Sequence, residues 1–292
     1  METVYFDTSA LRALGMGVLR RLPSGALYQT SVLALMELAS GLRRDRREYQ
    51  RRRVLLYGLA EIRFPIIRGG PEQMLRAAFR VLPPLPEDNR LLYIGRLAAL
   101  VREASDLTAF ETNIRTLNLV SLVEFFETYD RRVGEHYVQY SIGGHRVLRE
   151  KYARYQRGDE RLFPSHGIPR EADLREYLQG TGSLSVGLSF RAVVERLAEE
   201  AGDTSVEFRL KLGGSYDGSL DIFFQVWSRL DDERASSGSQ PAHNEMIDLG
   251  HFMYLRPGTV LVSDDRRMLD NARAVGCTAW TSDGLRRTIR EN

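Results

Sequence analysis

Two stretches of the sequence decide the expected fold: TVYFD at residues 3–7 and TVLVSDD at residues 259–265. Each is a short run of β-branched, aromatic or aliphatic residues that ends in one or two aspartates. Such a run is typical of a buried β-strand that presents carboxylates at its C-terminal end. A helical pattern follows each run, and strands that alternate with helices at both ends of the chain predict an α/β fold. We expect a parallel β-sheet flanked by helices.

The remaining expected elements place further acidic residues near these strands. Three more strands are expected, at Ala26–Thr30, Glu61–Ile67 and Cys277–Thr281. Pro65 places the second of these at the edge of the sheet or at a strand end. Ser31 is expected to cap a helix that carries Glu37, and a helix that begins near Pro241 is expected to carry Asp248.

The middle of the chain has a different pattern. Residues 83–240 begin with several prolines and continue mainly with helical apolar spacing, although Val206–Leu212 alternates and predicts one strand. Residues 235–241 (ASSGSQP) are typical of a linker. We therefore expect a discontinuous domain of residues 1–82 and 241–292, interrupted by a mainly α-helical inserted domain.

The composition is that of a globular chain with enough apolar residues for a core. Of the 292 residues, 43% are hydrophobic and 27% are charged, and the formal net charge is +2. No run approaches the roughly 18 apolar residues that cross a bilayer, so we expect no membrane partner. The single cysteine, Cys277, excludes an internal disulfide and a cysteine-based zinc site. The first residues show no basic leader, and a cytoplasmic location is the simplest expectation.

Arginine dominates the basic residues. Lysine occurs only twice among the 41 of them, which indicates either a GC-rich coding bias or phosphate binding by guanidinium groups. A basic run, Arg43–Arg53, directly follows the expected helix that carries Glu37. We interpret Arg43, Arg44 and Arg47 as candidate contacts to substrate phosphates, with a solvated helix face as the alternative.

The carboxyl ends of parallel strands meet at one edge of a sheet, and ligands bind there in α/β proteins. Asp7 and the Asp264–Asp265 pair follow two such strands, so we expect them to lie close together. Clustered carboxylates repel one another unless a cation balances their charge. Hard oxygen ligands favour Mg²⁺ or Mn²⁺, which can activate a water for attack on a phosphate. Glu37 and Asp248 could complete the cluster.

Four segments together resemble the PIN-domain family of nucleases, which includes the VapC-like ribonuclease toxins. The segments are VYFDTSAL, SVLALMELASGL, NEMIDLGHFMYL and VLVSDDRRMLDNARAVGC, and they occur in the family's order. EIRFPII also resembles the family's third strand. The resemblance covers residues 1–82 and 241–292, whereas residues 83–240 have no counterpart in a minimal family member.

The resemblance implies a metal-dependent nuclease with a PIN-like fold. Its catalytic acids would be Asp7, Glu37, Asp248 and Asp265. All of these except Glu37 would hold Mg²⁺ or Mn²⁺. Asp265 is preferred to Asp264 because it fits the family's Ser/Thr-x-Asp spacing from Ser263. Ser9 resembles the family's small hydroxyl residue near the first carboxylate, and both serines are expected near the substrate.

Two polar residues flank Asp248 on the same expected helix. His251 follows it by about one turn, and Asn244 precedes it by about one turn. Either could contact a substrate, but such residues more often support a site from behind or lie at the surface. We treat both as secondary candidates.

Three functions remain open at this point. The leading interpretation is a ribonuclease, restrained as a toxin or defence effector by an inhibitory protein partner. A structure-specific or single-stranded DNA nuclease is the alternative, with the inserted helices gripping DNA. A non-catalytic nucleic-acid-binding scaffold is disfavoured, because an idle carboxylate cluster destabilises a fold. The sequence also leaves open whether the chain is a monomer or a homodimer.

Overall fold

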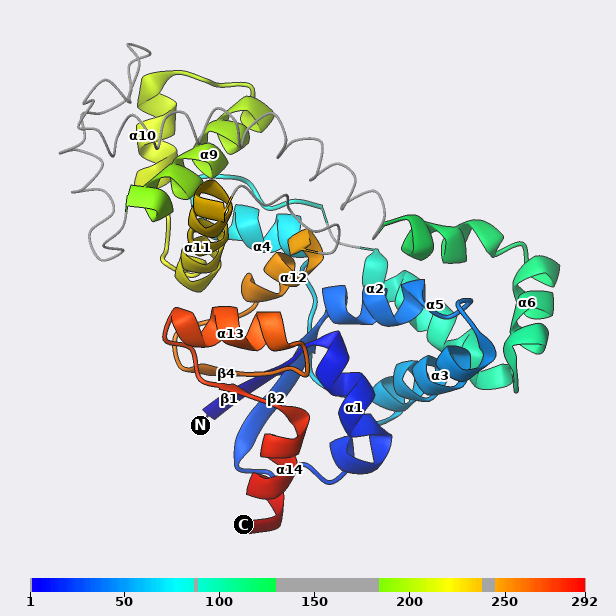
Figure 1. Ribbon diagram of the computed structural model, residues 1–292. Coiled ribbons are helices and arrows are strands. Elements are labelled where there is room, and N and C mark those ends of the chain that lie inside the picture. Colours follow the sequence, from blue (N-terminus) through cyan, green and yellow to red (C-terminus); the bar gives the residue numbers. More distant parts are fainter. Residues whose placement is uncertain (1, 87–88, 130–183, 238–244, 292) are drawn as a thin grey trace.

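A five-stranded parallel sheet forms the centre of the protein. The computed structural model describes residues 2–86, 89–129, 184–237 and 245–291 (Figure 1). The strands lie in the order β3-β2-β1-β4-β5, and every neighbouring pair is parallel. They are β1 (Glu2–Phe6), β2 (Ala26–Ser31), β3 (Ile66–Ile67), β4 (Thr259–Val262) and β5 (Ala279–Trp280). The expected α/β fold with a parallel sheet is confirmed.

Helices connect and flank the strands. Those that directly follow or join strands are α1 (Thr8–Leu19), α2 (Val32–Ser40), α3 (Arg46–Glu61), α4 (Pro71–Ala77), α12 (Glu245–Phe252), α13 (Arg266–Ala274) and α14 (Ser282–Glu291). The central part of the chain adds α5 (Arg90–Glu103), α6 (Leu107–Thr116), α9 (Leu184–Ala201), α10 (Val206–Gly214) and α11 (Asp221–Ser237), and residues 120–129 are helical as well. Within the described ranges, no helix combines the length and apolar character needed to cross a bilayer.

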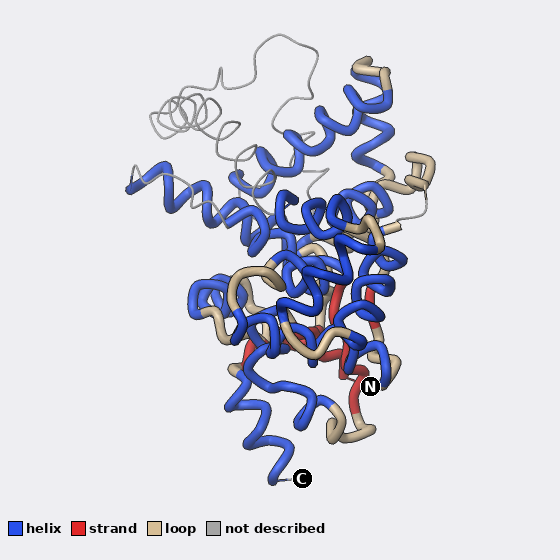
Figure 2. The backbone as a smooth tube through the Cα atoms, turned by 90° about the vertical axis from the view of Figure 1, so that its right-hand side faces the viewer, coloured by secondary structure: helices blue, strands red, loops and turns tan. Residues whose placement is uncertain are grey.

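Both faces of the sheet are buried, because successive residues of a strand point to opposite sides. Val4 and Phe6 of β1 pack in one hydrophobic cluster with side chains of α1, α3 and α14. Tyr5 and Leu261 point to the other face and pack in a second cluster with side chains of α4, α12 and α13. Figure 2 shows the strands among helices in the part of the molecule that holds both termini.

The described helices of the central part pack on the same two clusters. Leu97 and Val101 of α5 belong to the first cluster, and Phe223 and Phe224 of α11 belong to the second. These helices therefore bury apolar surface against the elements that surround the sheet. The mainly helical character expected for this part is confirmed where it is described, while the expected domain boundaries stay predictions.

The register between β1 and β4 decides which side chains meet at the edge of the sheet. Phe6 lies opposite Val262, and the backbone N–H of Asp7 donates to the carbonyl of Val262 at 3.3 Å. Both strands end at this point. Asp7 and Ser263 therefore leave the sheet side by side, although 256 positions separate them in sequence.

The strand expected at Val206–Leu212 is wrong, because these residues belong to helix α10. Ser205 caps this helix: its hydroxyl accepts from the backbone N–H of Phe208 at 3.2 Å. Residues that alternate along a strand also include pairs four positions apart, which meet on one face of a helix. Leu212 is buried while Val206 is exposed, so the helix buries only one side of the alternating run.

Three further boundaries differ from the sequence-based expectation. The strand expected at Glu61–Ile67 consists only of Ile66–Ile67, because α3 continues through Glu61. It follows Pro65 and lies at the edge of the sheet, as Pro65 predicted. The expected linker at residues 235–241 is helical as far as Ser237. The last strand is shortened to Ala279–Trp280, and Pro241 and Asn244 lie outside the described residues.

Candidate active site

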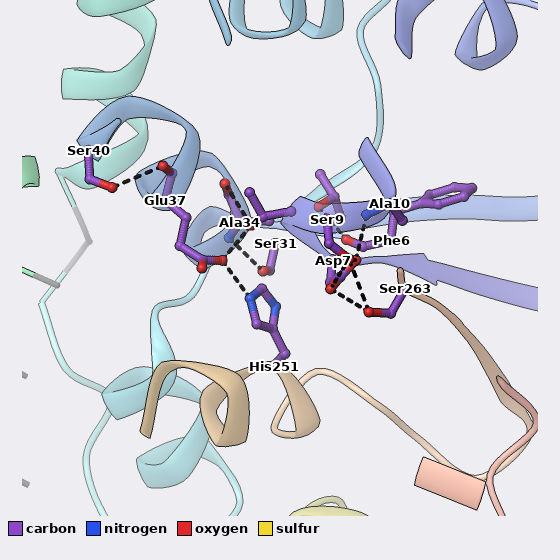
Figure 3. A network of polar contacts seen from close by, with 12 residues as sticks. Phe6, Asp7, Ser9, Ala10, Ser31, Ala34, Glu37, Ser40, His251 and Ser263 are labelled. Carbon is purple, nitrogen blue, oxygen red and sulfur yellow. Dashed lines mark hydrogen bonds and ion pairs between the residues drawn. The ribbon is translucent and has the colours of Figure 1, made fainter. Parts of the chain in front are cut away.

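Asp7 is held at the C-terminal end of β1 by four hydrogen bonds. Asp7 is only 4% exposed. Oδ1 accepts from the backbone N–H of Ala10 at 2.8 Å, so Asp7 is the N-cap of α1. The Ser9 hydroxyl lies 3.0 and 2.9 Å from the two carboxylate oxygens, and the Ser263 hydroxyl donates to Oδ2 at 2.7 Å (Figure 3).

Ser9 and Ser263 also tie the two strand ends to each other. Their hydroxyl oxygens are 3.1 Å apart. The backbone N–H of Asp264 donates to Ser9 at 2.7 Å, and that of Asp265 donates to Ser263 at 3.0 Å. The two serines expected near the substrate therefore orient the Asp7 carboxylate and fix the loop that carries both later aspartates.

Asp264 and Asp265 have different roles in the fold. Asp264 accepts from the backbone N–H and the hydroxyl of Ser282, at 2.9 and 2.6 Å, and thereby holds the start of α14. Asp265 caps α13 through Oδ1, which accepts from the N–H of Met268 at 2.9 Å. Both oxygens of Asp264 are thus used for structure, which favours Asp265 as the member of the pair that serves a ligand.

Matched substitutions distinguish the roles of Asp264 and Asp265. Asp264→Asn should lower the free energy of unfolding by about 1 kcal/mol, because it weakens the hydrogen bonds to Ser282. It should leave the binding of Mn²⁺ within about threefold of wild type, whereas Asp265→Asn should weaken it at least about tenfold if Asp265 serves a metal ion. Urea denaturation and Mn²⁺ titration of both variants check this. Equal losses of Mn²⁺ affinity in the two variants would contradict the assignment of Asp265.

Glu37 and His251 form a buried ion pair next to these residues. Nε2 of His251 lies 2.7 Å from Oε2 of Glu37, and the hydroxyl of Thr8 donates to the same oxygen. On its other side, Nδ1 of His251 lies 2.6 Å from the hydroxyl of Tyr5, which lies 2.8 Å from that of Ser31. His251, only 2% exposed, therefore orients the Glu37 carboxylate rather than lying at the surface (Figure 3).

The charges of this pair stabilise each other. Burial acts to raise the pKa of Glu37, but the charge and hydrogen bond of His251, the Thr8 hydroxyl and the Arg52 charge outweigh it and lower the pKa below its usual value. Burial acts to lower the pKa of His251, but Glu37 and the nearby aspartates raise it above its usual value. Both shifts favour the ionised forms, a carboxylate for Glu37 and an imidazolium for His251.

Asp248, on α12, is coupled electrostatically to the other three predicted acids. Burial and the charges of Asp265, Glu37 and Asp7 together raise its pKa to about 7, against the opposing charge of His251. Burial likewise raises the pKa of Asp7. The four carboxylates thus share one electrostatic environment in which negative charge exceeds positive charge.

The raised pKa of Asp248 predicts a pH-dependent stability. A carboxylate whose pKa is higher in the folded protein than in the unfolded chain destabilises the fold progressively as the pH rises from about 4 to about 7. Asp248→Asn should therefore raise the free energy of unfolding by about 2–3 kcal/mol at pH 8, with no gain at pH 4. Urea denaturation in EDTA at both pH values checks this, with the exposed Asp270→Asn as the control. A gain of equal size at both pH values would contradict the assigned cause.

The donor chemistry of the site fits a hard divalent cation. In the part of the chain that the structure describes, no compact group of three or more His, Cys, Asp or Glu side chains could hold a metal ion as it stands. Mg²⁺, however, commonly keeps several waters and uses only one or two carboxylates. Burial and the neighbouring carboxylates, which together raise the pKa of Asp248, disfavour its ionised form, and such an ion would relieve this cost.

The predicted phosphate-contacting arginines are placed differently from one another. Arg43 donates from Nε and Nη2 to the two carboxylate oxygens of Glu127, both at 2.8 Å. Arg44 and Arg47 are exposed. Arg52, which the sequence did not single out, is buried and donates to the backbone carbonyls of Glu37 and Leu38 at the end of α2.

Three residues of the site were missed by sequence reasoning: Tyr5, Thr8 and Arg52. A signal existed for two of them. Tyr5 is a polar side chain within a buried strand, so its hydroxyl needs a partner. Thr8 lies in the hydroxyl-rich DTS triplet that follows β1. Nothing in the sequence indicated that Arg52 would reach back to the helix that carries Glu37.

Comparison of the chain with protein-family models, with curated proteins and with solved structures gave no match. The chemistry of the site therefore rests on its own residues: a buried aspartate held by two serines, a glutamate held by a histidine, and two further aspartates coupled to them electrostatically.

Proposed function

We propose that this protein is a metal-dependent nuclease of the PIN-domain type. The observation that carries the proposal is the convergence of four acids from both ends of the chain at the carboxyl edge of a parallel sheet. Asp7 and Asp265 lie at the ends of neighbouring strands, and the pKa of Asp248 is raised by its burial and by the charges of Asp265, Glu37 and Asp7. Such a concentration of carboxylates is costly for the fold unless it serves a cation.

Three aspartates would bind the metal ion, and two serines orient one of them. Asp7, Asp265 and Asp248 would hold Mg²⁺ or Mn²⁺, and the ion supplies charge neutralisation at the phosphate and a more acidic water. Ser9 and Ser263 keep the Asp7 carboxylate in one orientation through hydrogen bonds.

Glu37 faces the same space. His251 and Thr8 both bond its Oε2, and among the described residues no hydrogen bond engages Oε1, which could accept one from the attacking water. The lowered pKa of Glu37 favours its ionised form, so Glu37 would orient this water rather than accept a proton from it.

RNA is the favoured substrate, as the resemblance to ribonuclease toxins implies, and single-stranded or structured DNA is the alternative. An inhibitory protein partner and a cytoplasmic location belong to the same proposal. Growth arrest on expression of the wild-type chain, relieved by Asp265→Asn, would support the toxin interpretation. Equal growth with both chains would remove it without affecting the proposed chemistry.

The direct test is cleavage by purified protein. End-labelled single-stranded RNA, single-stranded DNA and flapped DNA are incubated with Mn²⁺, with Mg²⁺ or with EDTA, and Asp265→Asn serves as the matched control. We expect RNA cleavage with the metals and none with EDTA or with the variant. Cleavage in EDTA, or unchanged cleavage by the variant, would contradict the proposal, and binding without any cleavage would support a scaffold instead.

A further inference from the structure

An open, polar cavity of about 700 Å³ lies beside the helix that carries Glu37. It is formed by the end of α2, the loop to α3, the helices α3 and α6, and the helical residues 120–129. Four arginines and two glutamates line it: Arg43, Arg44, Arg52, Arg115, Glu111 and Glu127. In Figure 1 these elements lie on the same side of the molecule, away from α9 and α11.

The arginines of this cavity are of two kinds. Arg43 is neutralised by Glu127, and Arg52 is buried and anchored to the backbone of α2. Arg44 and Arg115 are exposed, and neither guanidinium makes a hydrogen bond or a close ion pair with any residue that the structure describes. The cavity therefore presents two guanidinium groups that can bind an anion, and the fork of a guanidinium matches the oxygens of a phosphate.

The cavity adjoins the acidic site along one face of α2. Ser40 lines the cavity and lies three residues after Glu37, so both side chains occupy the same helix face. Gly41 follows, about one helical turn or 6 Å from Glu37. A Cβ atom at position 41 would overlap the guanidinium of Arg52, so the glycine makes the anchored position of Arg52 possible.

We propose that this cavity binds the phosphodiester backbone of a single-stranded nucleic acid whose neighbouring phosphate lies at the acidic site. The inference rests on the proposed nuclease function and names how the substrate is held. Helix α6 and residues 120–129 belong to the central part of the chain that has no counterpart in a minimal PIN domain. That part thus supplies one wall of the cavity.

Binding measured without cleavage tests this site separately from the chemistry. The probe is a fluorescent 12-nucleotide RNA in EDTA, and its affinity is measured by anisotropy at several salt concentrations. The double variant Arg44→Ala/Arg115→Ala should bind about tenfold more weakly at 0.15 M salt and lower the logarithmic salt slope by about 1.4, since each lost contact removes about 0.7. Arg21→Ala, an exposed arginine after α1, is the matched control and should bind as wild type does.

Glu127→Gln provides a test in the opposite direction. It removes the carboxylate that neutralises Arg43, so this third guanidinium becomes available to a phosphate. The variant should bind the RNA about fourfold more tightly and steepen the salt slope by about 0.7. A misfolded variant would not gain affinity.

Failure of this inference is distinguishable from failure of the proposed function. If wild type cleaves the RNA while the double variant and Glu127→Gln bind it unchanged, the cavity is not the backbone site. If wild type cleaves nothing but the variants change RNA affinity as expected, the proposed binding site is supported and the proposed nuclease function is contradicted. Competition by polyglutamate as strong as that by an oligonucleotide of equal charge would overturn the assignment to nucleic acid.

Discussion

Replacement of Asp7 by asparagine should lower the rate of RNA cleavage at least about 10³-fold without destabilising the protein. The rate loss, equivalent to about 4 kcal/mol of transition-state free energy, follows if Asp7 is a principal ligand of the ion. Asparagine is as good an N-cap as aspartate, so α1 keeps its start. Single-turnover cleavage with excess enzyme and Mn²⁺ measures the effect.

The stability of the same variant makes this prediction specific. Burial raises the pKa of Asp7, so its ionised form carries a cost in the folded protein that a neutral amide avoids. The Ser9 and Ser263 hydroxyls can rotate to accept from the amide or donate to its oxygen. The free energy of unfolding at pH 8 should therefore stay equal to that of wild type or rise.

A matched control comes from an aspartate outside the site. Asp283 has an 81% exposed side chain on α14, and Asp283→Asn should retain full activity. Loss of activity in Asp7→Asn together with a lower melting temperature would mean that the fold was damaged. Full activity in Asp7→Asn would remove Asp7 from the site and the proposed mechanism with it.

The parts of the fold that follow from local patterns were predictable. β1 and β4 are short apolar runs that end in aspartates, and their pairing brings Asp7 beside Ser263 as a parallel sheet requires. The Ser31 cap of α2 was likewise visible in the sequence. These features depend on a few neighbouring residues and on one rule about sheets.

What could not be predicted depends on contacts between distant segments. The alternating Val206–Leu212 run is compatible with a strand or a helix. The Ser205 cap and the burial of only one side of the run favour the helix. The partner of Glu37 could not be read from its own helix either. His251 reaches it from 214 positions away, because Tyr5 and α12 meet on the same face of the sheet.

That pair leads to the largest expected effect on stability. His251→Gln should lower the free energy of unfolding by about 3–5 kcal/mol at pH 6, because it leaves the buried charge of Glu37 without its counter-ion. The double variant Glu37→Gln/His251→Gln buries no charge and should recover much of this loss. Urea denaturation of wild type, both single variants and the double variant closes a thermodynamic cycle for the pair.

The pH dependence of the cycle tests whether the pair is ionic. The pKa of His251 is raised on folding, so its stabilisation is complete below the unfolded value of 6.5 and is lost as the pH rises through the folded value. The pKa of Glu37 is lowered, so its stabilisation is complete above the unfolded value of 4.5 and is lost as the pH falls through the folded value. The coupling energy should therefore be largest between pH 4.5 and 6.5 and should decline on both sides. A coupling energy that stays constant from pH 5.5 to pH 9 would show that the two residues share only a neutral hydrogen bond.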